Sequence, residues 1–131
     1  MIDSLFKKNL TYKDTHDVEQ RISESNRILA KHPNLIPIIV SADDKIGPLK
    51  KNKFLCPADI SFSQFLCSVR KQITLDSSQA IFAFCNGKII SSTSSMRSIY
   101  QEYMDSNNNG RERYDKFLYL TLELESTFGS I

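Results

Sequence analysis

Residues 35–73, LIPIIVSADDKIGPLKKNKFLCPADISFSQFLCSVRKQI, decide the fold. The stretch opens with the apolar, mostly β-branched residues 35–40, which predict a buried strand. Pro37 in that strand has no backbone N–H, so we expect it to face a side that lacks a partner strand. The polar segment that follows contains Gly47-Pro48, which indicates a turn. Residues 53–57 then predict a second, short strand that ends at a proline.

The last part of the same stretch predicts a helix. Ser61 and Gln64 have the spacing of a capping box, in which a hydroxyl and an amide each satisfy an exposed backbone N–H at the helix start. Apolar residues then recur at helical spacing. They are Phe62, Phe65, Leu66, Val69 and Ile73.

A longer helix is predicted upstream of the first strand. Its inward stripe has four members at helical spacing, which are Val18, Ile22, Ser25 and Leu29. Asp14 or Thr15 can serve as its N-cap, and Pro33 stops it because proline cannot continue the hydrogen-bond ladder. A shorter, polar helix is expected before it, at residues 4–9.

Downstream, residues 80–85 and 88–90 predict a hairpin, because Asn86-Gly87 between them fits a turn with positive φ at both central positions. A helix follows, whose apolar side carries Met96, Ile99, Tyr100 and Tyr103. The asparagine-rich segment from Asp105 to Asp115 is expected to be a mobile loop. The final strand, residues 117–124, places leucines 118, 120, 122 and 124 on one face.

This order of elements favours an α+β fold with a β-grasp sheet. The first two strands are expected to pair antiparallel, and the last strand is expected to lie centrally beside the first. We divide the chain into an N-terminal helical extension (1–31), a core (32–125) and a flexible C-terminal tail (126–131).

Composition narrows the function. The 131 residues are 40% hydrophobic and 24% charged, with a net charge of +2, which excludes a strongly basic nucleic-acid arm and an acidic tail. No apolar run approaches the ~20 residues of a membrane span, and the first residues lack the apolar core of a signal peptide.

Cysteine and histidine usage suggests neither a metal site nor an active site. Cys56, Cys67 and Cys85 sit among apolar residues, so we expect buried, reduced thiols in a cytosolic protein. His16 and His32 lie far from them in sequence, so no metal or cofactor is expected. No nucleophile, base and orienting group can be assembled either, so the chain is not expected to be an enzyme.

Seven short motifs occur in order along the chain and carry a resemblance. They are NLIPII (34–39), KFLCPAD (53–59), VRK (69–71), AIFAF (80–84), SIYQE (98–102), FLYLT (117–121) and TFG (127–129). In this order they resemble the autophagy ubiquitin-like modifiers, the family of GABA-receptor-associated protein and the microtubule-associated light-chain homologues. The resemblance runs from about Val18 to Gly129. It implies a ubiquitin-like β-grasp core with two additional N-terminal helices.

The resemblance implies a modifier of autophagy. A cysteine protease would cut after Phe128-Gly129, and activating and conjugating enzymes would transfer the new C-terminus to the amine of phosphatidylethanolamine. Glycine suits this role because it has no Cβ to crowd its carbonyl in a narrow channel. Two acyl chains would anchor the protein stably. The protein would then be cytoplasmic until it is lipidated, and afterwards at the autophagosome membrane.

The resemblance also implies a peptide groove. Receptors with an aromatic-x-x-aliphatic motif beside acidic residues would add as a strand to the edge at 53–56. By match to family positions, the aromatic pocket would use Glu24, Ile28, Pro37, Lys53, Leu55 and Phe117. The aliphatic pocket would use Phe54, Cys56, Pro57, Ile60, Phe65 and Ser68. The acidic residues would meet Lys51, Lys53 and Arg70.

Simpler interpretations stay open for several of these residues. Phe54 and Leu55 could be ordinary core, and the lysines at 50–53 could be a solvated turn. Ile28 lies off the inward stripe of its helix, which suits a pocket wall. Several positions also depart from the family, since Leu35 stands where many members have an arginine and Ser68 replaces an aliphatic residue.

Two other functions are alternatives. Departures at residues 122–125 suggest a β-grasp peptide-binding adaptor that is never conjugated. A small RNA-binding domain is suggested by Phe82 and Phe84 beside Lys88. The balanced charge argues against RNA, and Phe82 and Phe84 share a face with Ala80, which suits a core better than a stacking platform.

Overall fold

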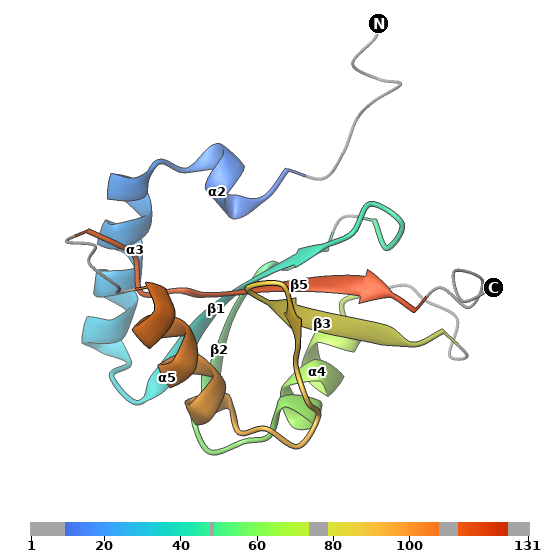
Figure 1. Ribbon diagram of the computed structural model, residues 1–131. Coiled ribbons are helices and arrows are strands. Elements are labelled where there is room, and N and C mark those ends of the chain that lie inside the picture. Colours follow the sequence, from blue (N-terminus) through green and yellow to red (C-terminus); the bar gives the residue numbers. More distant parts are fainter. Residues whose placement is uncertain (1–9, 48, 74–78, 108–112, 126–131) are drawn as a thin grey trace, which may run out of the picture.

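A computed structural model describes residues 10–47, 49–73, 79–107 and 113–125. A five-stranded sheet lies at its centre, in the order β2-β1-β5-β3-β4 (Figure 1). Its strands are β1 (Leu35–Ala42), β2 (Lys53–Pro57), β3 (Ile81–Cys85), β4 (Lys88–Ile89) and β5 (Leu118–Leu124). β1 pairs antiparallel with β2 and parallel with β5. The predicted α+β β-grasp arrangement, with the last strand beside the first, is therefore confirmed.

Helices cover both faces of the sheet. They are α2 (Tyr12–Thr15), α3 (Val18–Lys31), α4 (Phe62–Arg70) and α5 (Met96–Asn107). The larger core joins α4 and α5 to the face of β1 that carries Ile36, Ile38 and Val40. A smaller cluster on the other face joins Ile39 to α2. β1 is thus buried on both faces, which explains its continuous apolar sequence. No helix in the described ranges is long and apolar enough to cross a membrane.

Pro37 lies at a position of β1 where its missing N–H breaks no hydrogen bond of the sheet. The N–H of Val40 points to the β2 side, where it donates to the Asn52 carbonyl at 2.8 Å. Backbone N–H groups alternate along a strand, so the nitrogen of Pro37 points to the β5 side. Pairing with β5 begins only at the next residue, Ile38. Pro37 therefore removes no bond from the ladder, as its chemistry requires.

Local end signals predicted some element boundaries correctly and others wrongly. The capping box of Ser61 and Gln64 starts α4 as expected, and both turn residues between β3 and β4 have positive φ, 52° at Asn86 and 79° at Gly87. The predicted N-cap of α3 was wrong. Asp17, which binds the N–H of Gln20, caps α3, whereas Asp14 belongs to the capping box of α2. The helix expected at 4–9 lies outside the described residues.

Three expectations about burial were wrong. Cys67 is exposed, while Cys56 is buried and Cys85 is half-buried, because Cys67 lies off the face of α4 that packs on the sheet. Val18 is exposed, and Ser25 is the residue of α3 that is buried. In β3 the core side carries Ile81 and Ala83, so Phe82 lies on the other face, with 38% of its surface exposed.

The segment from Asp105 to Asp115 is only partly a loop. α5 continues to Asn107, and Asp115 is buried. Residues 108–112 in the middle of the segment lie outside the described ranges. The prediction of a mobile loop over the whole segment was therefore wrong at both ends.

Candidate functional site

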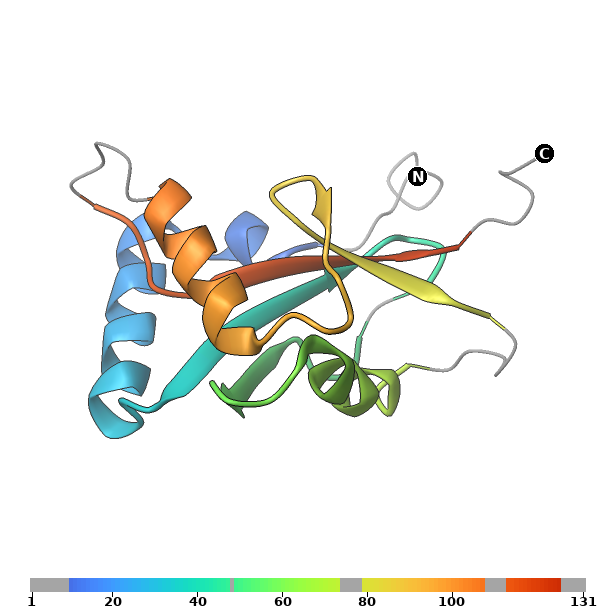
Figure 2. The same ribbon diagram turned by 60° about the horizontal axis from the view of Figure 1, so that its bottom comes forward.

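β2 lies at an edge of the sheet, away from the β3–β4 hairpin (Figure 2). The hydrogen bond from Val40 to Asn52 fixes which backbone groups of β2 face β1. Groups alternate along a strand, so the N–H and C=O of Lys53 and of Leu55 point outward. Among the described strands only β1 pairs with β2. The outward groups can therefore accept another extended chain.

The two faces of β2 lead to different surroundings. Phe54 and Cys56 turn toward α4 and belong to the larger core. Lys53 and Leu55 turn toward α3, and 42% of Leu55 is exposed. The structure thus answers the open question about two residues, since the Phe54 side chain is core and the Leu55 side chain is not.

The structure brings together most of the residues predicted for the aromatic pocket. Ile28 of α3 packs partly buried against the cluster of Tyr12, Ile39 and Phe117. Pro37 is fully buried, and by alternation along β1 it shares a face with Ile39. Ile28 lies off the inward stripe predicted for α3, and it forms a wall of this cluster instead. The Lys53 ammonium lies 2.5 Å from the Glu24 carboxylate, so an ion pair connects α3 to β2.

Glu24 is a charged acceptor shared by two donors. The Lys53 ammonium and the Tyr12 hydroxyl bind its two oxygens, and the Lys53 ammonium also lies 5.0 Å from the centre of the Tyr12 ring. Burial by itself raises the pKa of the Glu24 carboxyl, but the two hydrogen bonds and the charge of Lys53 outweigh it, and the pKa lies below its ordinary value. Burial, and then Glu24, raise the pKa of Tyr12. Glu24 is thus held ionised at the mouth of this pocket.

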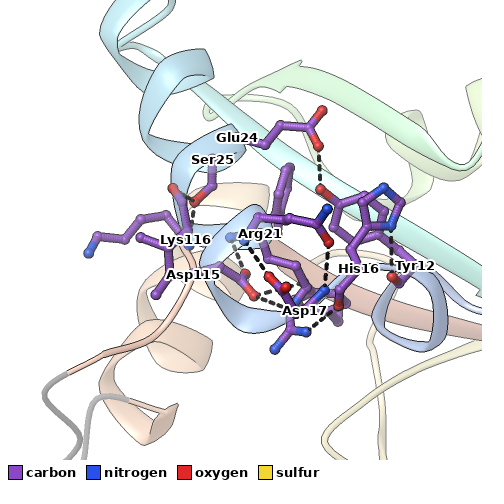
Figure 3. Close-up of polar contacts among 12 residues, drawn as sticks. Tyr12, His16, Asp17, Arg21, Glu24, Ser25, Asp115 and Lys116 are labelled. Atoms are coloured by element: carbon purple, nitrogen blue, oxygen red, sulfur yellow. Dashed lines mark hydrogen bonds and ion pairs between the residues drawn. The ribbon is translucent and has the colours of Figure 1, made fainter.

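A second polar cluster holds α3 against the start of β5 (Figure 3). Arg21 donates from Nε to the Asp115 carboxylate at 3.0 Å and from Nη1 to the His16 carbonyl at 2.8 Å. Asp115 also accepts from the Phe117 N–H at 3.0 Å and from the Tyr119 hydroxyl at 2.9 Å. The cluster therefore fixes Phe117, a predicted wall of the aromatic pocket.

Ser25, one turn further along α3 than Arg21, also contacts the segment just before β5. Its hydroxyl donates to the Ile22 carbonyl at 3.2 Å and accepts from the Lys116 N–H at 2.9 Å. The side chain is completely buried. A small residue is needed here because the backbone before β5 approaches the helix closely. Glu24 and Ile28 are held in place from the same helix.

The predicted aliphatic pocket divides into a floor and a rim. The floor is buried core, in which the Phe54 and Phe65 rings meet edge to face with centroids 5.6 Å apart. Burial raises the pKa of the Cys56 thiol to about 11, so this cysteine is an apolar floor residue and not a nucleophile. Rim positions are exposed or half-buried, and they are Pro57, Ile60 and Ser68.

The three predicted cations differ in their contacts. The Lys51 ammonium lies 4.9 Å from the centre of the Phe54 ring, and the residue is exposed. Lys53 already binds Glu24. The Arg70 guanidinium donates to the Gln79 carbonyl at 3.2 Å. Lys51 is therefore the most accessible of the three for an acidic residue of a ligand. Lys53 would have to bind such a residue while it also binds Glu24.

Phe128 and Gly129 lie outside the described residues. The described chain ends at Glu125, whose N–H donates to the Ala80 carbonyl at 2.9 Å directly after β5. β5 points away from α3 (Figure 1). In the described parts of the chain, no group of three His, Cys, Asp or Glu residues could hold a metal ion.

Sequence reasoning predicted Glu24 and Lys53 but missed other polar residues that hold the site together. Tyr12 binds Glu24 from α2, and Arg21 binds Asp115 across 94 positions of sequence. An Asp in an otherwise polar segment carries no sign of burial. The one usable signal was Ser25, because a polar residue in the inward stripe of a helix needs a hydrogen-bond partner.

Comparisons of the whole chain point to one family. A family model described as "Autophagy protein Atg8 ubiquitin like" matches residues 20–129. Autophagy-related protein 8a of Arabidopsis thaliana is 37% identical over 123 residues, which cover 92% of this chain and 94% of that protein. Autophagy-related protein 8 of Emericella nidulans is 38% identical over 120 residues, which cover 90% and 95%.

Solved structures give a consistent result. The crystal structure of Trypanosoma brucei ATG8 matches with a TM-score of 0.75 and 32% identity, over 90% of this chain and 97% of that one. Plasmodium falciparum Atg8, in complex with a Plasmodium falciparum Atg3 peptide, matches with a TM-score of 0.69 over 87% and 95% of the two chains. At 23% identity, the second match supports the fold alone.

Proposed function

This chain belongs to the Atg8 family of ubiquitin-like autophagy proteins, and we propose that it acts as a lipid-conjugated modifier with a peptide groove and not as an enzyme. The observation that carries the groove is the edge of β2. Its outward backbone groups lie between the Glu24–Lys53 pair on one side and the Phe54–Phe65 floor on the other. A strand added there gains backbone hydrogen bonds, and its alternate side chains reach opposite faces.

The groove suits an acidic peptide with an aromatic residue and an aliphatic residue. The aromatic side chain would lie beside Leu55 and Phe117, and the aliphatic side chain would lie over Phe65. The exposed Lys51 ammonium would meet the acidic residues, which gives orientation more than affinity. Receptors with this motif are the proposed partners. Plasmodium falciparum Atg8, which shares the fold, is itself in complex with an Atg3 peptide.

A binding measurement tests the groove. Leu55→Asp places a charge on an exposed site of β2, and we expect it to weaken binding of an aromatic-x-x-aliphatic peptide by more than tenfold. Ile89→Asp is the matched control, because Ile89 is exposed on β4 at the other edge of the sheet. Equal affinities for the parent chain and Leu55→Asp would rule out this edge as the binding site.

The second part of the proposal concerns the C-terminus. A cysteine protease hydrolyses the bond after Gly129, because only a terminal carboxylate can be activated for acyl transfer. The activating enzyme uses ATP to convert this carboxylate to an acyl adenylate, with release of pyrophosphate, and an enzyme thiol displaces AMP to form a thioester. The amine of phosphatidylethanolamine then displaces the thiol to form an amide. The family match ends at Gly129, which supports this position. The protein is then cytoplasmic before conjugation and bound to the autophagosome membrane afterwards.

Reconstitution tests the conjugation. The chain is combined with the protease, the activating and conjugating enzymes and vesicles that contain phosphatidylethanolamine. We expect a product that ends at Gly129 and carries the mass of the phospholipid, and we expect Gly129→Ala to be conjugated far more slowly. Equal conjugation of Gly129→Ala would contradict the proposed role of Gly129. A chain that keeps Ser130-Ile131 and gains no lipid would favour an unconjugated peptide-binding adaptor.

A further inference from the structure

A cavity of about 630 Å³ lies where the free edge of β2 ends. Its walls come from the end of α3, the start of β1, the segment after β2 and the first turns of α5. The apolar part of the lining includes Leu29, Leu35, Pro57, Ala58 and Tyr100. A volume of this size is ample for a large side chain.

The walls of the cavity are tied together by hydrogen bonds. The Arg97 N–H donates to the Ala58 carbonyl at 3.0 Å, and the Met96 N–H donates to the Ile60 carbonyl at 2.9 Å. The Tyr100 hydroxyl donates to the Lys116 carbonyl at 2.8 Å. The cavity is therefore formed before any ligand arrives, which lowers the ordering cost of binding.

The charges at its rim largely cancel. The Arg97 guanidinium and the Asp59 carboxylate form an ion pair at 2.8 Å. The side chains of Leu35, Pro57 and Tyr100 inside carry no charge. An uncharged, apolar side chain is the ligand that this lining fits, because a charged one would lose its hydration without gaining a free partner.

The cavity adjoins the proposed groove at Pro57, the last residue of β2, which lines the cavity. A peptide strand bound to Leu55 reaches Pro57 after about two residues, at roughly 3.3 Å each. Pro57 has no N–H to offer, so the added ladder stops there and the peptide is free to turn. Leu35, which pairs with Pro57 in the sheet, lines the cavity at this point.

We propose that this cavity is a third binding position for groove peptides and takes one bulky apolar side chain from the segment that runs past Pro57. This inference rests on the proposed groove and adds to its specificity. A peptide that carries only the aromatic-x-x-aliphatic motif would leave the cavity empty. Partners of this chain would then need a longer, partly apolar segment.

Calorimetric titration of the full chain with three peptides tests the inference. One peptide holds the motif alone, and the other two add a glycine and two leucines at one end or the other. We expect one of the extended peptides to bind about tenfold more tightly than the motif peptide. Serines in place of the two leucines should remove that gain.

Variants place the gain in the cavity. Leu35→Asp should remove the gain in affinity of the extended peptide. Gln101→Glu changes an exposed position on the cavity rim, so it should reduce this gain without altering the core. Ile89→Asp should leave it unchanged. The inference is overturned if neither extension gains affinity or if the gain survives Leu35→Asp. If the motif peptide itself fails to bind, the proposed groove is wrong and the third position falls with it.

Discussion

At the scale of single residues, the site depends on side chains whose charge or size cannot be replaced by a neighbour. Glu24 is the clearest case, because it accepts from both Tyr12 and Lys53 and so connects α3 to α2 and β2. Ser25, beside it, accepts from the backbone N–H of Lys116 just before β5. Both contacts connect elements that are separate in sequence.

Glu24 should make stability depend on pH. Its pKa is lowered in the folded chain, so its stabilising contribution is complete above the ordinary carboxyl pKa and is lost as the pH falls through the lowered value. The difference in free energy of unfolding between the parent and Glu24→Gln should therefore be larger near neutral pH than in acid. Urea denaturation across this pH range measures it. A difference that does not vary with pH would contradict the ion pair, and Lys53→Met should shrink the variation.

Ser25→Ala should destabilise the chain by about 1–2 kcal/mol, because it leaves the Lys116 N–H without its acceptor in a buried place. Ser25→Leu should cost more, since the helix must move away from β5 to make room. Ser23 is exposed on the same helix, so Ser23→Ala is the matched control and should change the free energy of unfolding very little. Similar losses for Ser25→Ala and Ser23→Ala would show that the hydroxyl contact is unimportant.

At the scale of elements, α3 is positioned by polar contacts rather than by an extensive apolar face. Val18 of its predicted stripe is exposed, and Ser25 is its buried residue. The Arg21–Asp115 pair, together with the Phe117 N–H and the Tyr119 hydroxyl, carries the attachment. Because Phe117 is a wall of the proposed aromatic pocket, the contacts that attach α3 would also set the shape of that pocket.

Asp115→Ala should therefore cost about 3–5 kcal/mol, the usual loss when one partner of a buried pair is removed. The Arg21 Nε–H, the Phe117 N–H and the Tyr119 hydroxyl would all lose their acceptor. The control is Asp59→Ala, which breaks an ion pair whose carboxylate is 85% exposed and should cost less than about 1 kcal/mol. Denaturation by urea compares the two, and equal losses would mean that Asp115 does not hold α3.

Signals close in sequence predicted elements well. Ser61 and Gln64 cap α4, and Asn86-Gly87 makes the hairpin turn, because both devices act within a few residues. The burial of Asp115 could not be predicted, since its partner lies 94 residues away. The core face of β3 was predicted wrongly because both of its faces carry apolar residues, and alternation alone cannot choose between Ile81 and Phe82.

At the scale of the whole molecule, the proposed groove and the strand that leads toward the C-terminus lie in different parts of the sheet. β2 forms one edge, and β1 separates it from β5, which leads to the C-terminus. The sequence predicted this topology from the order of elements. It supplied the proposed groove residues only through the family resemblance, because the proposed pockets combine residues from α3, β2 and the segment before β5 that no local pattern connects.

Peptide binding should stabilise the whole chain. A ligand that binds only the folded state, present at one hundred times its Kd, adds about 2.7 kcal/mol to the free energy of unfolding. An aromatic-x-x-aliphatic peptide should therefore raise the thermal midpoint of the parent chain and of Ile89→Asp. The same peptide should leave the thermal midpoint of Leu55→Asp nearly unchanged. A rise of the same size in Leu55→Asp would mean that the peptide binds somewhere other than β2.

The most direct measurement is the intact mass of the protein recovered from the membranes of cells in which autophagy is active. The account predicts a chain whose last residue is Gly129, joined through an amide to a phospholipid with an ethanolamine headgroup. A population that retains Ser130-Ile131 throughout, with no lipid-bearing species, would contradict it.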